Sequence, residues 1–141
     1  MSVREEIAED LVRVIRDIDR PRIGFVSRDP TVVNELANSQ YPCVLVTLGR
    51  EERLDETMKP SKTRSGRLEI TINGYTQSVA IDQSRNALIE AIEDKLESDR
   101  TRDSNAKNSR LLSIEIIETA PPYGAFTMTY EVFYTYTRGN S

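Results

Sequence analysis

Histidine is missing from this chain, and its absence excludes several kinds of chemistry. Serine and cysteine triads of the usual kind, histidine-bearing metal sites and imidazole general bases all need that side chain. A glycine-rich phosphate loop is missing as well, because the six glycines are scattered without the spacing that wraps a phosphate. We therefore expect no catalytic, cofactor-binding or metal-binding residues, and no enzymatic activity.

Cysteine and long apolar runs are also scarce. Cys43 is the single cysteine, so no internal disulfide can form, and the apolar run Val44-Leu45-Val46 beside it predicts a small buried side chain. No stretch approaches the roughly 18 apolar residues of a membrane span, and the first six residues do not resemble a signal peptide. We expect a protein made in a cytoplasm and used there or inside a soluble particle.

The charge balance argues against a general nucleic-acid-binding protein. The chain has 19 basic and 23 acidic side chains, a net charge of −4, whereas binding to a phosphate backbone needs a basic surface. Adjacent carboxylates such as Glu5-Glu6 and Glu93-Asp94 suit solvated helix surfaces better than paired acid–base catalysis. The acidic spacing of residues 99–103 does not match a calcium loop.

Two segments alternate apolar and polar residues with a period of two, which is typical of half-buried β-strands. Residues 67–75 place Leu68, Ile70 and Ile72 on one side. Residues 126–136 repeat the pattern, with Phe133 as an exception, and their apolar series is Phe126, Met128, Tyr130, Val132, Tyr134 and Tyr136. Shorter runs predict strands at residues 23–27, 43–48 and 111–117, and the second of these is apolar on both faces, as a central strand would be.

Two amphipathic helices accompany these strands. Residues 2–19 repeat apolar side chains every three or four positions, with Ser2 as N-cap, Glu5 as its capping-box partner and Pro21 beyond the end. Residues 82–99 form a second helix with Asp82 or Ser84 as N-cap. A turn at residues 29–31 leads into a helical turn that ends near residue 36. The sequence predicts one α+β domain, residues 1–141, with a mostly antiparallel mixed β-sheet and both helices packed on one face.

Residues 50–67 differ from the rest because apolar side chains nearly vanish there. The segment carries six basic and four acidic side chains, with a proline, serines and a glycine among them. We predict a long, charged and flexible hairpin arm that joins two strands. Connections of this length in small domains are binding elements or surface hairpins without a function, and both interpretations stay open.

Several segments follow one another in a recognisable order. They are a helix at residues 3–11, a strand at 41–49 followed by Arg50-Glu51-Glu52-Arg53, a strand at 68–75, a helix at 86–93, and Pro122-Tyr123-Gly124-Ala125-Phe126 before a tyrosine-rich last strand. This order covers nearly the whole chain and resembles the tail terminator proteins, also called minor tail or tail completion proteins, of long-tailed bacteriophages.

The resemblance implies a structural virion protein that needs no cofactor. Six copies would form a ring that caps the tail tube, stops its polymerisation and provides the joint to the head. The partners would be other copies of the chain, the tail tube protein and a head-side connector protein, with DNA passing through the ring without specific binding and no membrane involved. The protein would be found in the phage tail or neck, and in the host cytoplasm during assembly.

Charge suggests two candidate surfaces for such assembly. Residues 2–19 hold six acidic and three basic side chains and residues 82–99 hold six and two, so these helices carry −7 and the rest of the chain +3. An acidic helix face that lined the hole would repel DNA, although such faces are also ordinary solvated surface. The lumen or subunit-interface candidates are Glu90, Glu93, Asp94 and Glu97. The candidates for docking on the tube are Arg50, Arg53, Lys59, Lys62, Arg64 and Arg67.

Two further interpretations stay open. The first is a head completion or neck connector protein, which would bind portal or adaptor proteins and not the tube. The second is a non-viral α+β binding module or an accessory enzyme subunit. A binding module would stay monomeric, and an enzyme would show a pocket with perturbed carboxylates.

Overall fold

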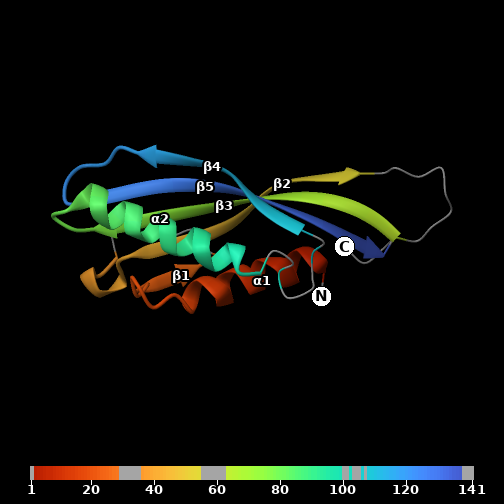
Figure 1. Cartoon of the computed structure of the whole chain (residues 1–141), viewed down its shortest axis with the longest axis horizontal. Helices are drawn as coiled ribbons and strands as arrows, with labels where there is room; N and C mark the ends of the chain where they lie inside the picture. Colours follow the sequence, from red (N-terminus) through yellow and green to blue (C-terminus); the bar gives the residue numbers. More distant parts are fainter. Residues whose placement is uncertain are drawn as a thin grey trace.

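The computed structural model describes residues 2–28, 36–54, 63–99, 102, 106 and 108–137, without the side chains of residues 54, 63, 64, 136 and 137. One five-stranded sheet runs through it in the order β1-β2-β3-β5-β4 (Figure 1). β1 is parallel to β2, and the other neighbours are antiparallel. The elements are α1 (Val3–Arg16), β1 (Phe25–Ser27), η2 (Asn38–Gln40, a 3₁₀ helix), β2 (Cys43–Leu54), β3 (Thr63–Gln77), α2 (Ile81–Glu97), β4 (Asn108–Ile117) and β5 (Tyr123–Thr137).

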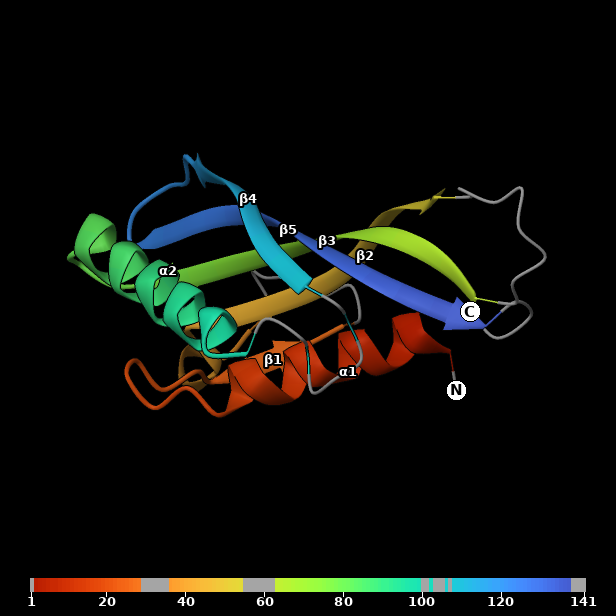
Figure 2. The same cartoon turned by 45° about the vertical axis from the view of Figure 1, so that its right-hand side comes forward.

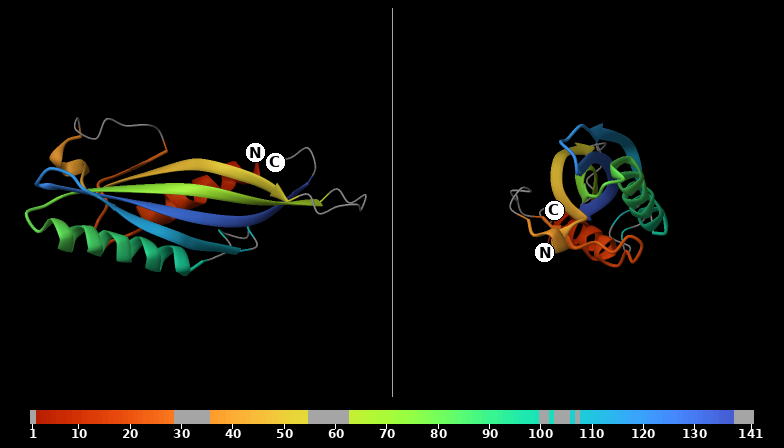
Figure 3. Two further views of the ribbon diagram at one scale, coloured as in Figure 1. Left: turned by 90° about the horizontal axis from the view of Figure 1, so that it is seen from above. Right: turned by 90° about the vertical axis from the view of Figure 1, so that its left-hand side faces the viewer.

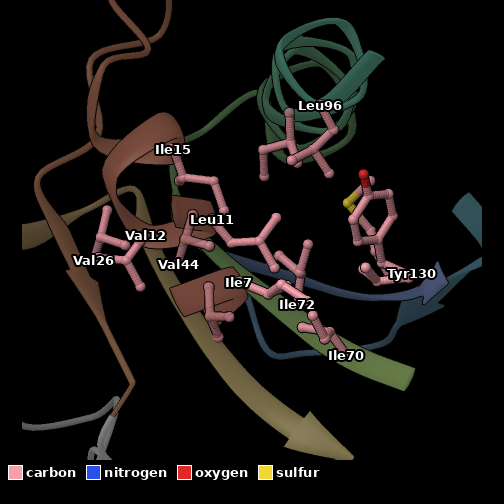
Figure 4. Packing of buried hydrophobic residues seen from close by; sticks show 14 of the residues in the cluster. Ile7, Leu11, Val12, Ile15, Val26, Val44, Ile70, Ile72, Leu96 and Tyr130 are labelled. Atoms are coloured by element: carbon pink, nitrogen blue, oxygen red, sulfur yellow. The ribbon is translucent and has the colours of Figure 1, made fainter. Parts of the chain in front are cut away.

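Both helices pack on the same face of the sheet, which confirms the predicted α+β fold (Figures 2 and 3). The predicted alternation is confirmed for the described side chains as well, because the even-numbered ones at residues 68–72 of β3 and 126–134 of β5 fill the core and the odd-numbered ones point to the opposite side. Figure 4 shows Ile7, Leu11 and Ile15 of α1 gathered with Ile70 and Ile72 of β3 in one apolar cluster. We call the odd-numbered side of β3 and β5 the open face.

α1 begins where the sequence predicts. The Ser2 hydroxyl accepts a hydrogen bond from the Glu5 backbone N–H at 3.2 Å, and so satisfies one of the donors left open at a helix start. The Glu5 carboxylate, predicted to close a capping box, instead accepts from Arg28 just after β1. The helix ends at Arg16 and not at the predicted residue 19.

The predicted N-caps of the second helix were wrong. α2 begins at Ile81, and Ala80 stands at the N-cap position without a side-chain hydrogen bond. The Ser78 hydroxyl, just before it, accepts from the Ala80 backbone N–H at 3.1 Å. Asp82 lies in the first turn, where negative charge is favourable, and its carboxylate accepts from Arg85 at 3.2 Å.

The predicted hairpin arm at residues 50–67 is built largely from strands and not from a long loop, and its flexibility stays a prediction. β2 continues to Leu54 and β3 begins at Thr63, and the two strands pair up to Leu54 opposite Ser65. A register shift between Leu48 and Glu51 marks a bulge in β2. These strand ends carry polar side chains on both faces, so the apolar alternation that identifies a strand is missing there. Residues 55–62, and the helical turn predicted after residue 29, lie outside the described residues.

Two glycines of β3 make room for aromatic rings of β5. Gly74 lies opposite Phe126 and Gly66 opposite Tyr134. A Cβ atom on Gly74 would lie 2.1 Å from the Phe126 ring, and one on Gly66 would lie 2.7 Å from the Tyr134 ring. Each ring therefore covers the backbone of the glycine across from it and fills the space that a side chain would occupy.

Replacing Gly74 by alanine is expected to lower the free energy of unfolding by about 1–3 kcal/mol, because the new methyl group overpacks the core against Phe126. Urea denaturation measures the loss. Adding Phe126→Leu to Gly74→Ala should cost less than the sum of the two single substitutions, since the smaller side chain leaves room for the methyl group. Additive losses would contradict a direct clash.

A buried ion pair joins α1 to the segment after α2. Asp10 is 4% exposed and Arg102 is completely buried, with Arg102 Nη1 3.4 Å from Asp10 Oδ2. Arg102 also donates a hydrogen bond to the Leu96 carbonyl oxygen at 2.8 Å and lies 6.0 Å from the centre of the Tyr130 ring. Its φ of 51° is in the left-handed region, which is uncommon for a residue with a side chain. One guanidinium thus connects both helices and β5.

Burial raises the pKa of the Asp10 carboxyl above its usual value, and the positive charge of Arg102 opposes the rise. Arg102→Ala is expected to lower the free energy of unfolding by about 1–3 kcal/mol at neutral pH, because it removes the buried one of the two cationic partners of Asp10 and leaves only Arg13, whose side chain is largely exposed. A raised pKa means that the folded state favours the protonated acid, so this loss grows as pH rises through that pKa.

Urea denaturation of both chains at about pH 4 and about pH 7 tests this expectation. The loss should be smaller at the acid pH. The double variant Asp10→Leu with Arg102→Leu is the control, because it removes both charges and should recover much of the stability. An equal loss at both pH values would show that Asp10 does not carry the effect.

Candidate assembly interface

β4 forms an exposed margin of the sheet. We call residues 112–116 the β4 edge. Leu112, Ile114 and Ile116 are 43%, 38% and 46% exposed. Ile114 and Ile116 lie opposite Met128 and Phe126, so they belong to the face that carries the helices, but α2 packs over β3 and β5 (Figure 1). In the described part of the chain no strand pairs with the outer side of β4. Unpaired strands with apolar side chains are surfaces for pairing with another chain.

The sequence predicted this strand but not its exposure. Residues 111–117 are apolar on both faces at Leu111, Leu112, Ile114, Ile116 and Ile117, a pattern typical of a covered strand. The sequence did contain a signal of the exposure, because the two predicted amphipathic helices are too few to cover a sheet that includes this strand. Apolar side chains that no other part of the chain covers indicate that another molecule covers them.

The basic residues predicted to dock on a tube differ in their placement. Arg50 and Arg53 are exposed on β2, and Arg53 lies 3.4 Å from the Glu51 carboxylate. Arg64 has its backbone in β3, while its side chain, and all of Lys59 and Lys62, lie outside the described residues. β2, β3 and β5 extend past the N-terminal end of α1 toward this end of the molecule (Figure 1). The docking role stays a prediction.

Arg67, the sixth of these residues, belongs to a row of charges across the open face. It forms an ion pair with Glu52 of β2 and lies 3.8 Å from the Glu131 carboxylate of β5. Glu131 is 3% exposed and also accepts from Arg110 of β4 at 3.2 Å. Arg110 lies 5.9 Å from the centre of the Phe133 ring. Phe133, which breaks the apolar alternation of β5, thus has a cationic partner on the open face. The row connects four strands and leaves Arg67 engaged within the sheet.

Small polar side chains occupy the middle of the open face. Four of them lie in one row across the strands, namely Thr47, Thr71, Thr129 and Ser113. In the next row the Thr127 hydroxyl donates to the Asn73 side-chain oxygen at 2.7 Å. These two rows are therefore rich in hydroxyl groups, with Glu115 of β4 as a charged residue at the margin of the second row.

The acidic residues predicted on the second helix lie on the outer side of α2. Glu90, Asp94 and Glu97 are exposed and Glu93 is partly exposed, whereas the side toward the sheet is formed by Leu88, Ile89, Ile92 and Leu96. The carboxylates form an accessible acidic strip. Its position at a lumen or a subunit interface stays a prediction.

A pocket of about 350 Å³ lies at the opposite end of the sheet from Leu54, lined by Tyr41, Tyr75 and Tyr123 among others. The Tyr41 and Tyr123 rings are 5.8 Å apart. Burial raises the pKa of Tyr41 and of Tyr75, so both phenols stay protonated at neutral pH. Cys43 is completely buried, as predicted, and burial raises the pKa of its thiol to about 11, which leaves little reactive thiolate.

Within the residues that the structure describes, no cluster of three or more histidine, cysteine or acidic side chains could hold a metal ion. The helices of the described ranges are not long and apolar enough to cross a membrane.

Comparison with known proteins gives little information on function. No protein-family profile and no curated protein sequence matches the chain. A chain in a solved structure, the virion of a native gene transfer agent particle, is similar over 96% of this chain and 92% of that chain, with 12% sequence identity and a TM-score of 0.39. A similarity of this size supports no functional conclusion.

Arg67→Ala is expected to lower the free energy of unfolding by about 1 kcal/mol, because Glu131 then keeps only Arg110 as a cationic partner in a nearly buried position. Arg50→Ala is the matched control. Arg50 is exposed, so its loss should change stability by less than about 0.5 kcal/mol. Urea denaturation compares the two variants, and equal effects would contradict a structural role for Arg67.

Proposed function

We propose that this chain is a structural virion protein that forms a ring, caps the phage tail tube, stops tube polymerisation and provides the joint to the head. The observation that carries the proposal is the β4 edge, where Ile114 and Ile116 are left exposed on the face that the helices cover elsewhere. Such an edge suits repeated association of identical subunits. The tail-tube part is supported by the order of segments in the sequence, which resembles the tail terminator proteins.

In this proposal the end of the molecule where β2 and β3 meet docks on the tube. Arg50 and Arg53 are exposed on β2 near that end, and Lys59, Lys62 and Arg64 follow in sequence. Positive side chains there would meet an acidic surface of the tube end and set orientation and association rate more than affinity. Arg67 would act within the subunit, since it is held by Glu52 and Glu131.

The acidic strip of α2 would face either the hole or a neighbouring subunit. Glu90, Asp94 and Glu97 are accessible for both roles. Facing the hole, the carboxylates would repel the DNA phosphates and let the DNA slide through without binding. Facing a neighbour, they would need basic partners on it.

Electron microscopy of polymerising tail-tube protein from the same virion tests the proposed function. With the chain present, tubes should become shorter and carry a ring at one end. Without it, or with bovine serum albumin in its place, they should grow unchecked. Bare tubes of unchanged length in the presence of the chain would overturn the tail-terminator proposal and favour a head-side connector.

Charge reversal tests the docking end separately. The triple variant Lys59→Glu, Lys62→Glu and Arg64→Glu is expected to weaken capping by more than about tenfold in the concentration required, because it opposes an acidic tube surface. The control reverses Arg20 and Arg22, which are exposed near the far end of α1, and should cap as the unmodified chain does. Equal capping by both variants would exclude these three residues as the docking site.

A further inference from the structure

The sheet has a second free margin on the side opposite β4. β1 pairs with β2 only at Cys43, Val44 and Leu45. From residue 46 to residue 54, which we call the β2 edge, no strand of the described ranges pairs with the outer side of β2. Figure 3 (left) shows β2 and β4 at the two margins of the sheet, with β3 and β5 between them. One sheet thus presents two different unpaired edges.

The strand directions make these two edges compatible. β2, β3, β5 and β4 alternate in direction, because each neighbouring pair is antiparallel. β4 therefore runs opposite to β2. When identical copies are repeated by rotation about one axis, β4 of one copy meets β2 of the next in antiparallel orientation, and the alternation continues without interruption.

Apolar side chains on the two edges lie on the same face. Leu48 on the β2 edge is 37% exposed and lies opposite Ile70 of the core face, as Ile114 and Ile116 lie opposite core residues of β5. Following the register across the sheet, Ile114 aligns with Val46 and Ile116 with Val44. Closing a sheet into a ring requires a stagger between strands. If β2 of the next copy is shifted by two residues, Leu48 takes the place of Val46 and lies beside Ile114. If it is shifted by four residues, Leu48 takes the place of Val44 and lies beside Ile116.

Exposed charged side chains lie on both edges. Glu115 on β4 and Glu118 just after it are exposed, and so are Arg50 and Arg53 on β2. In the four-residue stagger Glu115 lies opposite the bulge that contains Arg50, whereas Glu118 and Arg53 lie toward opposite ends of the paired segment. An attraction between Glu115 and Arg50 would favour this register, and Arg53 stays available for the tube end. Pairing β4 with β4 of another copy would place the acidic residues of both copies on one seam.

Bulges limit the length of the seam, by which we mean the contact between β4 of one copy and β2 of the next, and they bend it. The register shifts between Leu111 and Ser113 in β4 and between Leu48 and Glu51 in β2. The regular segments available for pairing are residues 113–117 of β4 and residues 46–48 and 51–54 of β2. Bulges increase local twist and bend the strand, and a ring wall built from twisted sheets needs such bends.

We infer that the β4 edge of one copy pairs antiparallel with the β2 edge of a second copy, head to tail, so that the sheet continues from subunit to subunit. This inference rests on the ring of the proposed function and identifies the two surfaces that build it. Ile114, Ile116 and Leu48 are covered at the seam. Both helices then lie on one side of the ring wall and the hydroxyl-rich open face lies on the other.

Cysteine cross-linking in full-length chains tests this seam. Ile116→Cys and Leu48→Cys are made in separate chains that carry tags of different mass, and each is treated with a short bis-maleimide, alone and mixed. Native Cys43 is completely buried with a pKa of about 11, so it should contribute little background. Head-to-tail pairing predicts a cross-linked dimer that contains one chain of each kind, formed in the mixture and in neither variant alone.

The other outcomes each have a defined meaning. A dimer of Ile116→Cys alone would overturn the inference in favour of pairing between two β4 strands. To separate the inference from the proposed function, the reaction is repeated with chains bound to tube ends. Capped tubes without the mixed dimer would overturn the seam and leave the function standing. Bare tubes with the mixed dimer would overturn the function and leave the seam standing, and bare tubes without it would overturn both.

A charge on the edge provides an independent measurement. The double variant Ile114→Lys and Ile116→Lys should weaken self-association by more than about tenfold in sedimentation velocity, because lysines on an edge strand oppose pairing. Val79→Lys is the control, since Val79 is completely exposed in the connection between β3 and α2 and lies on neither edge. Both variants should keep the circular dichroism of the unmodified chain. Unchanged association of the folded double variant would overturn the inference.

Discussion

The antiparallel pairing of β3 with β5 is the constraint on which the rest of the structure depends. Both strands are 15 residues long and pair over their whole length, from Thr63 opposite Thr137 to Gln77 opposite Tyr123. The period of two then assigns every side chain to one of two faces. One face receives the large apolar residues and both helices, and the other receives hydroxyl groups and the row of charges. β2 and β4 are added outside this central pair, so their unpaired margins follow from it.

The helices hold the core face in different ways. α2 lies over β3 and β5, while α1 packs toward β1 and β2, and Arg102 connects the two helices through Asp10 and the Leu96 carbonyl. Two helices do not cover the whole width of a five-stranded sheet, and β4 is left outside. An apolar strand that the subunit itself does not cover is costly for a solitary protein in water and useful in an assembly, where a neighbour can bury it.

Much of this fold could be predicted from the sequence, because the decisive segments are long and strongly periodic. The alternation in β3 and β5 and the apolar stripes of α1 and α2 fixed the α+β class and the one-sided packing. The extension of β2 and β3 into residues 50–67 could not be predicted, since ion pairs such as Arg67 with Glu52 stabilise these strand ends, and ion pairs leave no periodic apolar signal. The buried Arg102 was hidden for a similar reason, because nothing in a polar loop indicates that one arginine turns inward to Asp10.

The β4 edge could likewise be predicted only in part. Its strand was predicted, but which strand lies at a sheet margin is a property of topology, and one sequence does not specify the order of strands. The roles of the basic and acidic residues depend on partners, so the single chain can establish their accessibility and no more. Arg67 illustrates the gain from the structure, because its contacts with Glu52 and Glu131 separate it from the accessible Arg50 and Arg53.

The two glycines of β3 also restrict how the chain can misfold. Gly66 and Gly74 receive the rings of Tyr134 and Phe126 in the native alignment. If β5 slipped by two residues, Phe126 would stand opposite Ile72 or Thr76 and meet a side chain where the native strand has none. Hydrophobic patterning cannot reject such a slip, because it keeps every residue on its own face. The two glycines, each opposite one aromatic ring, therefore select one alignment of β5 among those with the same apolar pattern.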